Sequence, residues 1–433
     1  MVRCQHGKGA VIGRRAFLGS TAASLGSVLL GCDPVGAKGR ATVSLWFTYG
    51  GRNREVLEKL VSRFNRSQSD VWVRAVYQGD YFEGLAKLRT AVAAGAAPTL
   101  SHVIGEVVPY LAEARVLEPL GGYPGAADLD VIDALGQRGS WIGGDRHPLV
   151  ALPFNRSTPI AYLNRPLFDK AGVSAPATWD DLRRVARAMT VRRGERTVRH
   201  GFGCPISWWF WVALVGQAGG QLVDADGTVS LGGNAGVEAL ELWQQLARQD
   251  RTMKPPPGRD YNAWEQTNQD FLAQRTAMIW TSTAFLRYLE DNAPFSVEAA
   301  PLPRYRRHAV PTGGTHWVML RSAPREAKAA AWSFLSWMHR PAQVITWATE
   351  TGYLPTTRGA VAELETTGFF SKHPNHRVAL DQLEVALAWP WSTELFRIQR
   401  EVVEPRLEQA VLQGHDASVL LKEARALASR GTR

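Results

Sequence analysis

Residues 42–104 alternate three β-prone segments with two amphipathic ones, and this order restricts the fold more than any other feature of the chain. The β-prone segments are Thr42–Tyr49, Val71–Tyr77 and Leu100–Ile104. Between them, Arg54–Phe64 and Tyr81–Ala94 have apolar residues at helical spacing. A strand–helix–strand–helix–strand order predicts a parallel sheet with helices on both faces, and therefore an α/β fold.

A glycine-containing turn follows each of the three predicted strands. These turns are Gly50, Gly79-Asp80-Tyr81 and Gly105-Glu106. In sheets of this kind, ligands bind beyond the carboxyl ends of the strands. We therefore predict a binding site at these three turns.

The length of 433 residues exceeds one typical core and predicts two lobes. Further strands are predicted at 149–152 and 159–163, on either side of Phe154–Thr158, and at 275–281 and 317–320. Helices are predicted at 178–189, 233–248, 324–338, 402–412 and 418–428.

The first 31 residues have the pattern of an export signal. Arg14-Arg15 precedes a short apolar segment, which is typical of twin-arginine export. Leu29-Leu30-Gly31-Cys32 resembles a bacterial lipobox, in which the cysteine becomes lipidated. We expect a signal peptide at 1–31, a lipid anchor on Cys32 and a tether at 32–40, which would hold the protein on the periplasmic or extracellular face of the cell membrane. The alternative is a buried N-terminal helix with a chance cysteine.

Charge and cysteine content exclude several classes of protein. The net charge is +10, and the predicted signal peptide contains four basic and no acidic residues, so +10 − 4 = +6 remains. No Lys/Arg run forms a stripe, which argues against nucleic-acid binding; the densest cluster, at 187–199, is expected to form a solvated loop. Of three cysteines, only Cys204 would remain unmodified, which excludes an intrachain disulfide or a two-cysteine metal site.

No catalytic, cofactor or metal motif is found. The sequence has no phosphate-binding loop, no dinucleotide-binding glycine motif and no G-x-S-x-G elbow. Pro374 between His373 and His376 argues against a helical metal site. We expect no enzymatic activity, cofactor or metal, although a pair of catalytic carboxylates stays open on sequence alone.

Three segments resemble extracellular solute-binding proteins of ABC importers, in the sugar-binding group called family 1. They are Ala161–Gly172, Thr178–Leu182 and Thr351–Pro355. The resemblance runs from about residue 41 to the C-terminus. It implies a two-lobed periplasmic binding protein fold (type II) with the ligand cleft between the lobes, and a permease partner; we expect a monomer. The implied lobes are 41–151 with 305–339 and 152–304 with 340–433, joined by three crossing strands.

Within this group, the sequence is most similar to the periplasmic sn-glycerol-3-phosphate-binding members. That resemblance implies a phosphate contact from Arg400 and hydrogen bonds from glycerol hydroxyls to Glu106. The further ligand residues that it implies are Tyr81, Ser157, Trp209 (or Trp208), Ser282 (or Thr283), Gly313, Gly314 and Tyr353.

Departures from that pattern leave the ligand open. Trp389–Glu394 replaces a glycine-rich approach to the arginine, Arg397 lies one turn before Arg400, and Arg156 replaces a small serine. The first hypothesis is capture of glycerol-3-phosphate or of a glycerophosphodiester such as glycerophosphocholine. The second is a neutral oligosaccharide, which the 16 tryptophans favour. The third is a tethered glycosidase or phosphodiesterase.

Overall fold

The computed structural model describes residues 39–135, 142–144, 147–225, 227–256 and 261–429. The predicted signal peptide, Cys32 and all of the tether before Gly39 lie outside these residues. Within the described ranges, no helix has the length and apolar character needed to cross a membrane.

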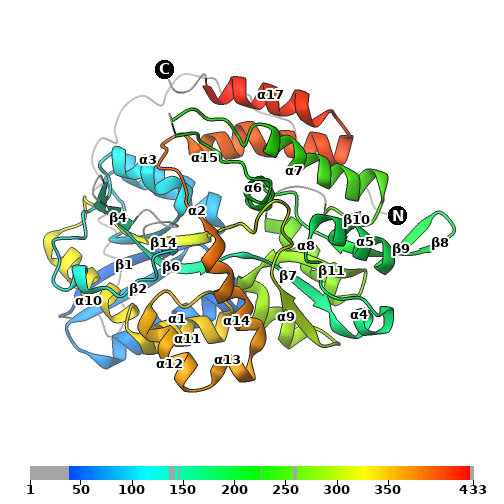
Figure 1. Ribbon diagram of the computed structural model, residues 1–433. Coiled ribbons are helices and arrows are strands. Elements are labelled where there is room, and N and C mark those ends of the chain that lie inside the picture. The colour runs from blue at the N-terminus through cyan, green and yellow to red at the C-terminus, as the bar shows by residue number, and fades with distance from the viewer. Residues whose placement is uncertain (1–38, 136–141, 145–146, 226, 257–260, 430–433) are drawn as a thin grey trace, which may run out of the picture. The chain divides into compact units, whose positions relative to one another are not determined.

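The first sheet contains the predicted parallel strands (Figure 1). Its order is β2-β1-β3-β14-β6; β1 is parallel to β2 and β3, while β14 is antiparallel to β3 and β6. The bounds are β1 (Ala41–Phe47), β2 (Val71–Tyr77), β3 (Leu100–Ile104), β6 (Ala151–Ser157) and β14 (Gly313–Met319). The parallel arrangement predicted for residues 42–104 is confirmed. Residues 154–157, placed between strands by sequence, instead continue strand β6 because they pair with β14.

Helices cover both faces of this sheet. They are α1 (Gly51–Ser67), α2 (Tyr81–Ala93), α3 (Val108–Glu113), α10 (Arg325–Met338) and α11 (Pro341–Thr351). The predicted apolar stripe of α1, from Val56 to Phe64, is buried. Asp80 begins α2: its side chain accepts hydrogen bonds from the backbone N–H groups of Phe82 and Glu83. This cap fixes the direction in which Tyr81 leaves the strand end.

The second sheet begins directly after the first. Only Thr158 separates the last residue of β6 from the first of β7. The sheet order is β10-β9-β11-β7-β12, with β8 paired to β9. The bounds are β7 (Pro159–Asn164), β8 (Val191–Arg193), β9 (Arg196–Gly203), β10 (Met253–Lys254), β11 (Thr276–Ser282) and β12 (Val297–Ala300).

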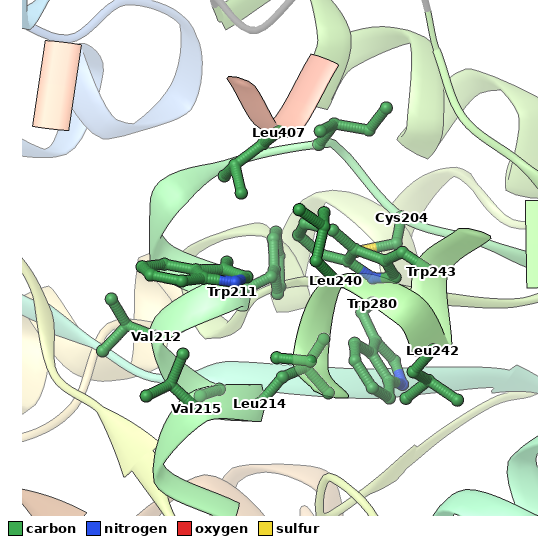
Figure 2. Close-up of a cluster of buried hydrophobic side chains, with 14 of the residues drawn as sticks. Cys204, Trp211, Val212, Leu214, Val215, Leu240, Leu242, Trp243, Trp280 and Leu407 are labelled. Carbon is green, nitrogen blue, oxygen red and sulfur yellow. The ribbon is translucent and has the colours of Figure 1, made fainter. Parts of the chain in front are cut away.

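A tryptophan-rich core packs against this sheet (Figure 2). It joins α6 (Trp208–Gln217), α7 (Asn234–Gln244), α16 (Glu404–Glu408) and α17 (Ala417–Ala428). Every residue of α6 is buried, so it has no polar face, and periodicity did not predict it as a helix. Further helices are α4 (Arg165–Ala171), α5 (Trp179–Met189), α8 (Tyr261–Leu272), α9 (Leu286–Asn292), α12 (Arg358–Thr366), α13 (Phe369–Lys372), α14 (Pro374–Asp381) and α15 (Leu395–Arg397).

The boundaries between the two sheets differ from those expected. The backbone N–H groups of Arg306 and Arg307 donate to the carbonyl of Gln217, and β13 (Val310–Pro311) pairs with β15 (Ala386–Leu387). Residues 306–311 therefore lie with the helices of the second sheet, and the first sheet is rejoined at Gly313, not 305. Helix α11 packs on α1, and Trp347 is buried in the first core, so that core extends beyond 340.

We predict that the C-terminal helices are needed for the second core. Leu407 is fully buried there (Figure 2), and Leu407→Ala should lower the free energy of unfolding by about 2–5 kcal/mol because it leaves a cavity. Denaturant titration measures this change. Val419→Ala on α17 is the control because Val419 is 53% exposed; equal loss in both variants would contradict the assignment.

Candidate ligand-binding cleft

A cleft opens where the elements of the two sheets meet. Its volume, including space open to solvent, is about 1230 Å³. It is lined by Thr48, Tyr49, Gly50, Asn53, Tyr77, Asp80, Tyr81, Phe82, Ile104, Glu106, Ser157, Ser207, Trp208, Trp209, Trp264, Ser282, Ala284, Phe285, Gly313, Gly314, Tyr353, Gln399 and Glu404. All three turns predicted from the strand ends contribute to it, so the general geometry expected from the sequence is present.

The structure brings most of the implied ligand residues together. Tyr81, Glu106, Ser157, Trp209, Ser282, Gly313, Gly314 and Tyr353 all line the cleft, and so does Trp208. Thr283, Arg397 and Arg400 are not among the lining residues. Sequence reasoning did not name Thr48, Tyr49, Trp264, Gln399 or Glu404 as lining residues.

Asn155 positions the two tyrosines. Their hydroxyl oxygens are 3.4 Å apart, and the Asn155 amide donates to Tyr353 at 3.3 Å and to Tyr81 at 3.5 Å. The Asn155 side-chain oxygen in turn accepts the backbone N–H of Thr315 at 2.5 Å. The pKa of Tyr81 is raised, mainly by burial, so this phenol faces the cleft as a neutral hydrogen-bonding group.

The two glycines at the start of β14 allow close packing. Gly314 has φ +95°, and a Cβ there would lie 1.8 Å from the Asn155 carbonyl oxygen. A Cβ on Gly313 would lie 2.7 Å from the Trp209 ring. Glycine is thus required at 314 by conformation, and at 313 so that the indole can lie against the strand.

Trp209 belongs to an aromatic wall of the cleft. Its ring centroid lies 5.8 Å from that of Trp264, which lies 6.4 Å from that of Phe285. Trp209 is 9% exposed. Trp211, by contrast, is a core residue whose indole N–H donates to the Gly236 carbonyl.

The two candidate arginines have carboxylate partners within the chain. Arg400 Nη1 is 2.7 Å from Glu404 Oε2, and the guanidinium lies over the Phe82 ring, 3.9 Å from its centroid. Arg397 Nε is 2.6 Å from Glu394 Oε2. Glu404, 2% exposed, is the member of the first pair that lines the cleft. Arg400 itself is not among the lining residues, so its implied phosphate contact stays a prediction.

Arg156 is a buried cation near the cleft. It is 1% exposed, and its Nη2 donates to Thr312 Oγ1 at 2.9 Å. Burial lowers its pKa to about 10, which leaves it charged at neutral pH. Burial raises the pKa of Glu106, and the positive charge of Arg156 opposes that shift. The negative charge of Glu106, at the end of β3, is therefore partly balanced by the positive charge of Arg156.

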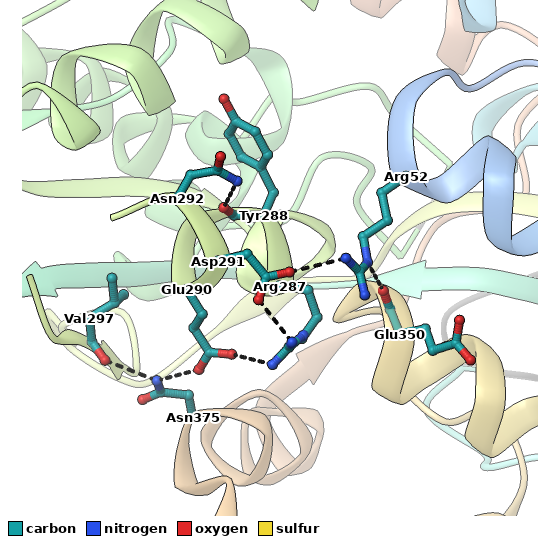
Figure 3. Close-up of polar contacts among 9 residues, drawn as sticks. All are labelled: Arg52, Arg287, Tyr288, Glu290, Asp291, Asn292, Val297, Glu350 and Asn375. Atoms are coloured by element: carbon teal, nitrogen blue, oxygen red, sulfur yellow. Dashed lines mark hydrogen bonds and ion pairs between the residues drawn. The ribbon is translucent and has the colours of Figure 1, made fainter. Parts of the chain in front are cut away.

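Figure 3 shows an ion-pair network that includes Arg52. The next residue in the sequence, Asn53, lines the cleft. Arg52 Nη1 is 3.0 Å from Asp291 Oδ2, and Arg52 Nε donates to the Glu350 carbonyl at 2.5 Å. Arg287 pairs with Asp291 and Glu290. The network joins α1 and α11 of the first sheet to α9 of the second.

The sequence matches the bacterial extracellular solute-binding protein family over residues 59–378. The chain belongs to this family. It is 22% identical over 371 residues to the sn-glycerol-3-phosphate-binding periplasmic protein UgpB of Pectobacterium atrosepticum, and the alignment covers 80% of each chain.

Solved structures show the same fold. UgpB from Mycobacterium tuberculosis, in complex with glycerophosphocholine, superposes with a TM-score of 0.78 at 22% identity, covering 90% of this chain and 98% of that one. The substrate-binding protein Lmo0181 from Listeria monocytogenes, in complex with cycloalternan, also has a TM-score of 0.78, at 19% identity and 91% and 99% coverage. The expected two-lobed fold is thereby confirmed. Within the described residues, no cluster of three or more His, Cys, Asp or Glu side chains is arranged for a metal ion.

Two buried histidines behind the cleft predict acid sensitivity. His102 stacks on Tyr49, with ring centroids 5.4 Å apart, and burial lowers its pKa to about 3; His316 is shifted in the same direction. Below about pH 6.5, both histidines bind a proton in the unfolded chain but stay neutral in the folded protein. The free energy of unfolding should therefore fall as the pH falls from about 6.5 toward 3.

His102→Leu removes one of these groups. The slope of unfolding free energy against pH between about 6 and 4 should then shrink by up to about 1.4 kcal/mol per pH unit. Denaturant titrations at several pH values measure it. His308→Leu at an exposed position is the control, and an unchanged slope in His102→Leu would show that this histidine does not carry the effect.

Proposed function

We propose that this substrate-binding protein of an ABC importer captures an uncharged sugar or short oligosaccharide and delivers it to the permease subunits. One observation carries the choice of ligand. The charged side chains among the described lining residues are Asp80, Glu106 and Glu404, and all three are acidic. An anion entering this cleft would lose hydration without meeting a lysine or arginine among the described lining residues, which is costly, whereas an uncharged polyol would not.

The rest of the lining suits a sugar. Trp209, Trp264 and Phe285 line the cleft, aromatic rings can pack on the apolar faces of a pyranose, and aromatic walls with a few placed polar groups are typical of small-molecule sites. The Tyr81 and Tyr353 hydroxyls and the Glu106 carboxylate can donate to and accept from ligand hydroxyls.

A glycerophosphodiester such as glycerophosphocholine is the second candidate. The relatives named for glycerol-3-phosphate favour it, and Trp209 with nearby acids would suit a quaternary ammonium group through cation–π contact. Arg156 would supply positive charge behind the cleft. We rank it second, reversing the order expected from sequence, because Arg400 and Arg397 already pair with Glu404 and Glu394.

Calorimetry on the processed protein with maltose, maltotriose, glycerol-3-phosphate and glycerophosphocholine tests the ranking. We expect a neutral sugar to bind and glycerol-3-phosphate not to bind. Trp209→Ala should weaken the sugar about tenfold by removing the ring face, while Trp72→Ala, on a half-buried residue outside the cleft, should not. A parent that binds only the phosphate esters would overturn the proposal.

The arginines separate the two candidates further. If Arg400 holds a phosphate, Arg400→Ala should weaken glycerophosphocholine about thirtyfold, as expected for loss of a buried charged contact. Under the sugar proposal, the affinity of folded Arg400→Ala for maltotriose stays within about threefold of the parent. Because Glu404 would lose its partner, a thermal melt must accompany the measurement.

We also propose that Cys32 anchors the protein after removal of residues 1–31. Lipidation of one cysteine with more than one acyl chain gives stable membrane attachment. In cells, the parent should fractionate with membranes, and Cys32→Ala should appear soluble or unprocessed. Cys204→Ala is the matched control because that cysteine is buried in the second core. Membrane fractionation and lipid labelling of Cys32→Ala at the parent's level would rule the anchor out.

A further inference from the structure

Two buried hydroxyl groups just after strand β1 lack hydrogen-bond partners among the described residues. Thr48 is 5% exposed and Tyr49 is 7% exposed, and both line the cleft. Within the described part of the chain, neither Thr48 Oγ1 nor the Tyr49 hydroxyl has a hydrogen-bond partner. Buried hydroxyls are nearly always hydrogen-bonded, so two adjacent exceptions in a binding cleft point to a ligand that supplies the partners.

Packing fixes both side chains in place. The Tyr49 ring stacks on His102 and lies 5.7 Å from the ring centroid of Trp347. The Thr48 methyl group fills the space above Gly84, where an added Cβ would lie 2.1 Å from Thr48 Cγ2. Neither side chain is therefore free to turn toward another partner within the protein.

Two further cleft residues, which come from the second core, also have unpartnered buried polar atoms among the described residues. The Trp209 Nε1 donor and the Gln399 Oε1 acceptor line the cleft and also have no partner among the described residues. They come from α6 and from the π-helical segment η6 (Ile398–Val403), which pack in the second core, whereas Thr48 and Tyr49 follow β1 of the first sheet. These four groups are uncharged, and together they offer both donors and acceptors.

We propose that Thr48 and Tyr49 form a further subsite, which binds the hydroxyl groups of a second sugar unit and so selects an oligosaccharide over a monosaccharide. This proposal rests on the proposed function, because it takes the ligand to be polyhydroxylated and uncharged. One unit contacts the group around Glu106, Tyr81 and Tyr353. The next unit supplies the partners that the end of β1 lacks.

Isosteric variants test the subsite on the full processed protein. Tyr49→Phe and Thr48→Val each remove one hydroxyl and keep the packing. Each should weaken maltotriose about threefold to tenfold, as expected for one hydrogen bond, and leave glucose affinity unchanged. The controls are Thr281→Val, a buried threonine with an unpartnered hydroxyl outside the cleft, and Tyr123→Phe, a tyrosine outside the cleft.

The unliganded protein provides an independent readout. Because the two hydroxyls have no partners, removing them should leave the melting temperature of the ligand-free protein unchanged or raise it, even though binding weakens. A structural role would instead lower it. A clear fall in melting temperature for Tyr49→Phe, beyond that of Tyr123→Phe, would overturn the proposal.

The outcomes distinguish this inference from the proposed function. If the parent binds maltotriose and both variants bind it equally well, the subsite is wrong and the proposed function stands. If the parent binds glycerol-3-phosphate or glycerophosphocholine alone, the proposed function and the oligosaccharide subsite both fail. Weaker maltotriose binding in both variants, with unchanged glucose affinity and undiminished stability, supports the subsite.

Discussion

The passage of the chain from one sheet to the other at Thr158 is the constraint on which the cleft depends. Thr158 is fully buried; its carbonyl accepts the backbone N–H of Thr283 at 3.1 Å, and its own N–H donates to Thr283 Oγ1 at 3.4 Å. Ser157 and Ser282, both lining the cleft, are the neighbours of this pair on the two strands. Because these hydrogen bonds join the two sheets, they hold the cleft residues of both sheets close to one another. A change in the angle between the sheets must therefore bend the backbone at Thr158 and at the other segments that connect the sheets.

Buried carboxylates near the cleft are paired with arginines of the same chain, and this pairing determines which charges the cleft surface carries. The carboxylate of Glu404 is almost fully buried, which is tolerable because Arg400 lies one turn before it and Gln399 donates to its other oxygen at 3.1 Å. Because Arg400 already pairs with Glu404, an anionic ligand would have to compete with that carboxylate for the guanidinium group. Glu106 is balanced by Arg156 from behind the strand end, so the cleft surface itself exposes oxygen atoms and aromatic rings rather than cations.

Local patterns predicted the first sheet and the turns of the cleft, because the order of strands and helices in residues 42–104 and the glycines after each strand are encoded by neighbours in sequence. The resemblance to known binding proteins named eight lining residues, two of which, Tyr81 and Glu106, also lie in those turns. What was missed depends on long-range packing. Helix α6 is buried on every side, so no stripe marked it, and Asn155 acts through Thr315, which is distant in sequence. The i,i+4 spacing of Arg400 and Glu404 was visible in the sequence and was the signal that a helical ion pair would form.

Unpartnered groups in the cleft imply that the ligand-free protein is less stable than its packing would allow. Each buried hydroxyl, amide oxygen or indole N–H that lacks a partner has lost its hydration, and among the described residues Thr48, Tyr49, Trp209 and Gln399 each have one such atom in the cleft. A ligand that supplies the partners recovers that free energy only while the first and second sheets both contact it. These unsatisfied atoms are therefore a source of selectivity, since a ligand too short to reach both sides leaves some of them without partners, and a ligand of the wrong charge adds a new cost.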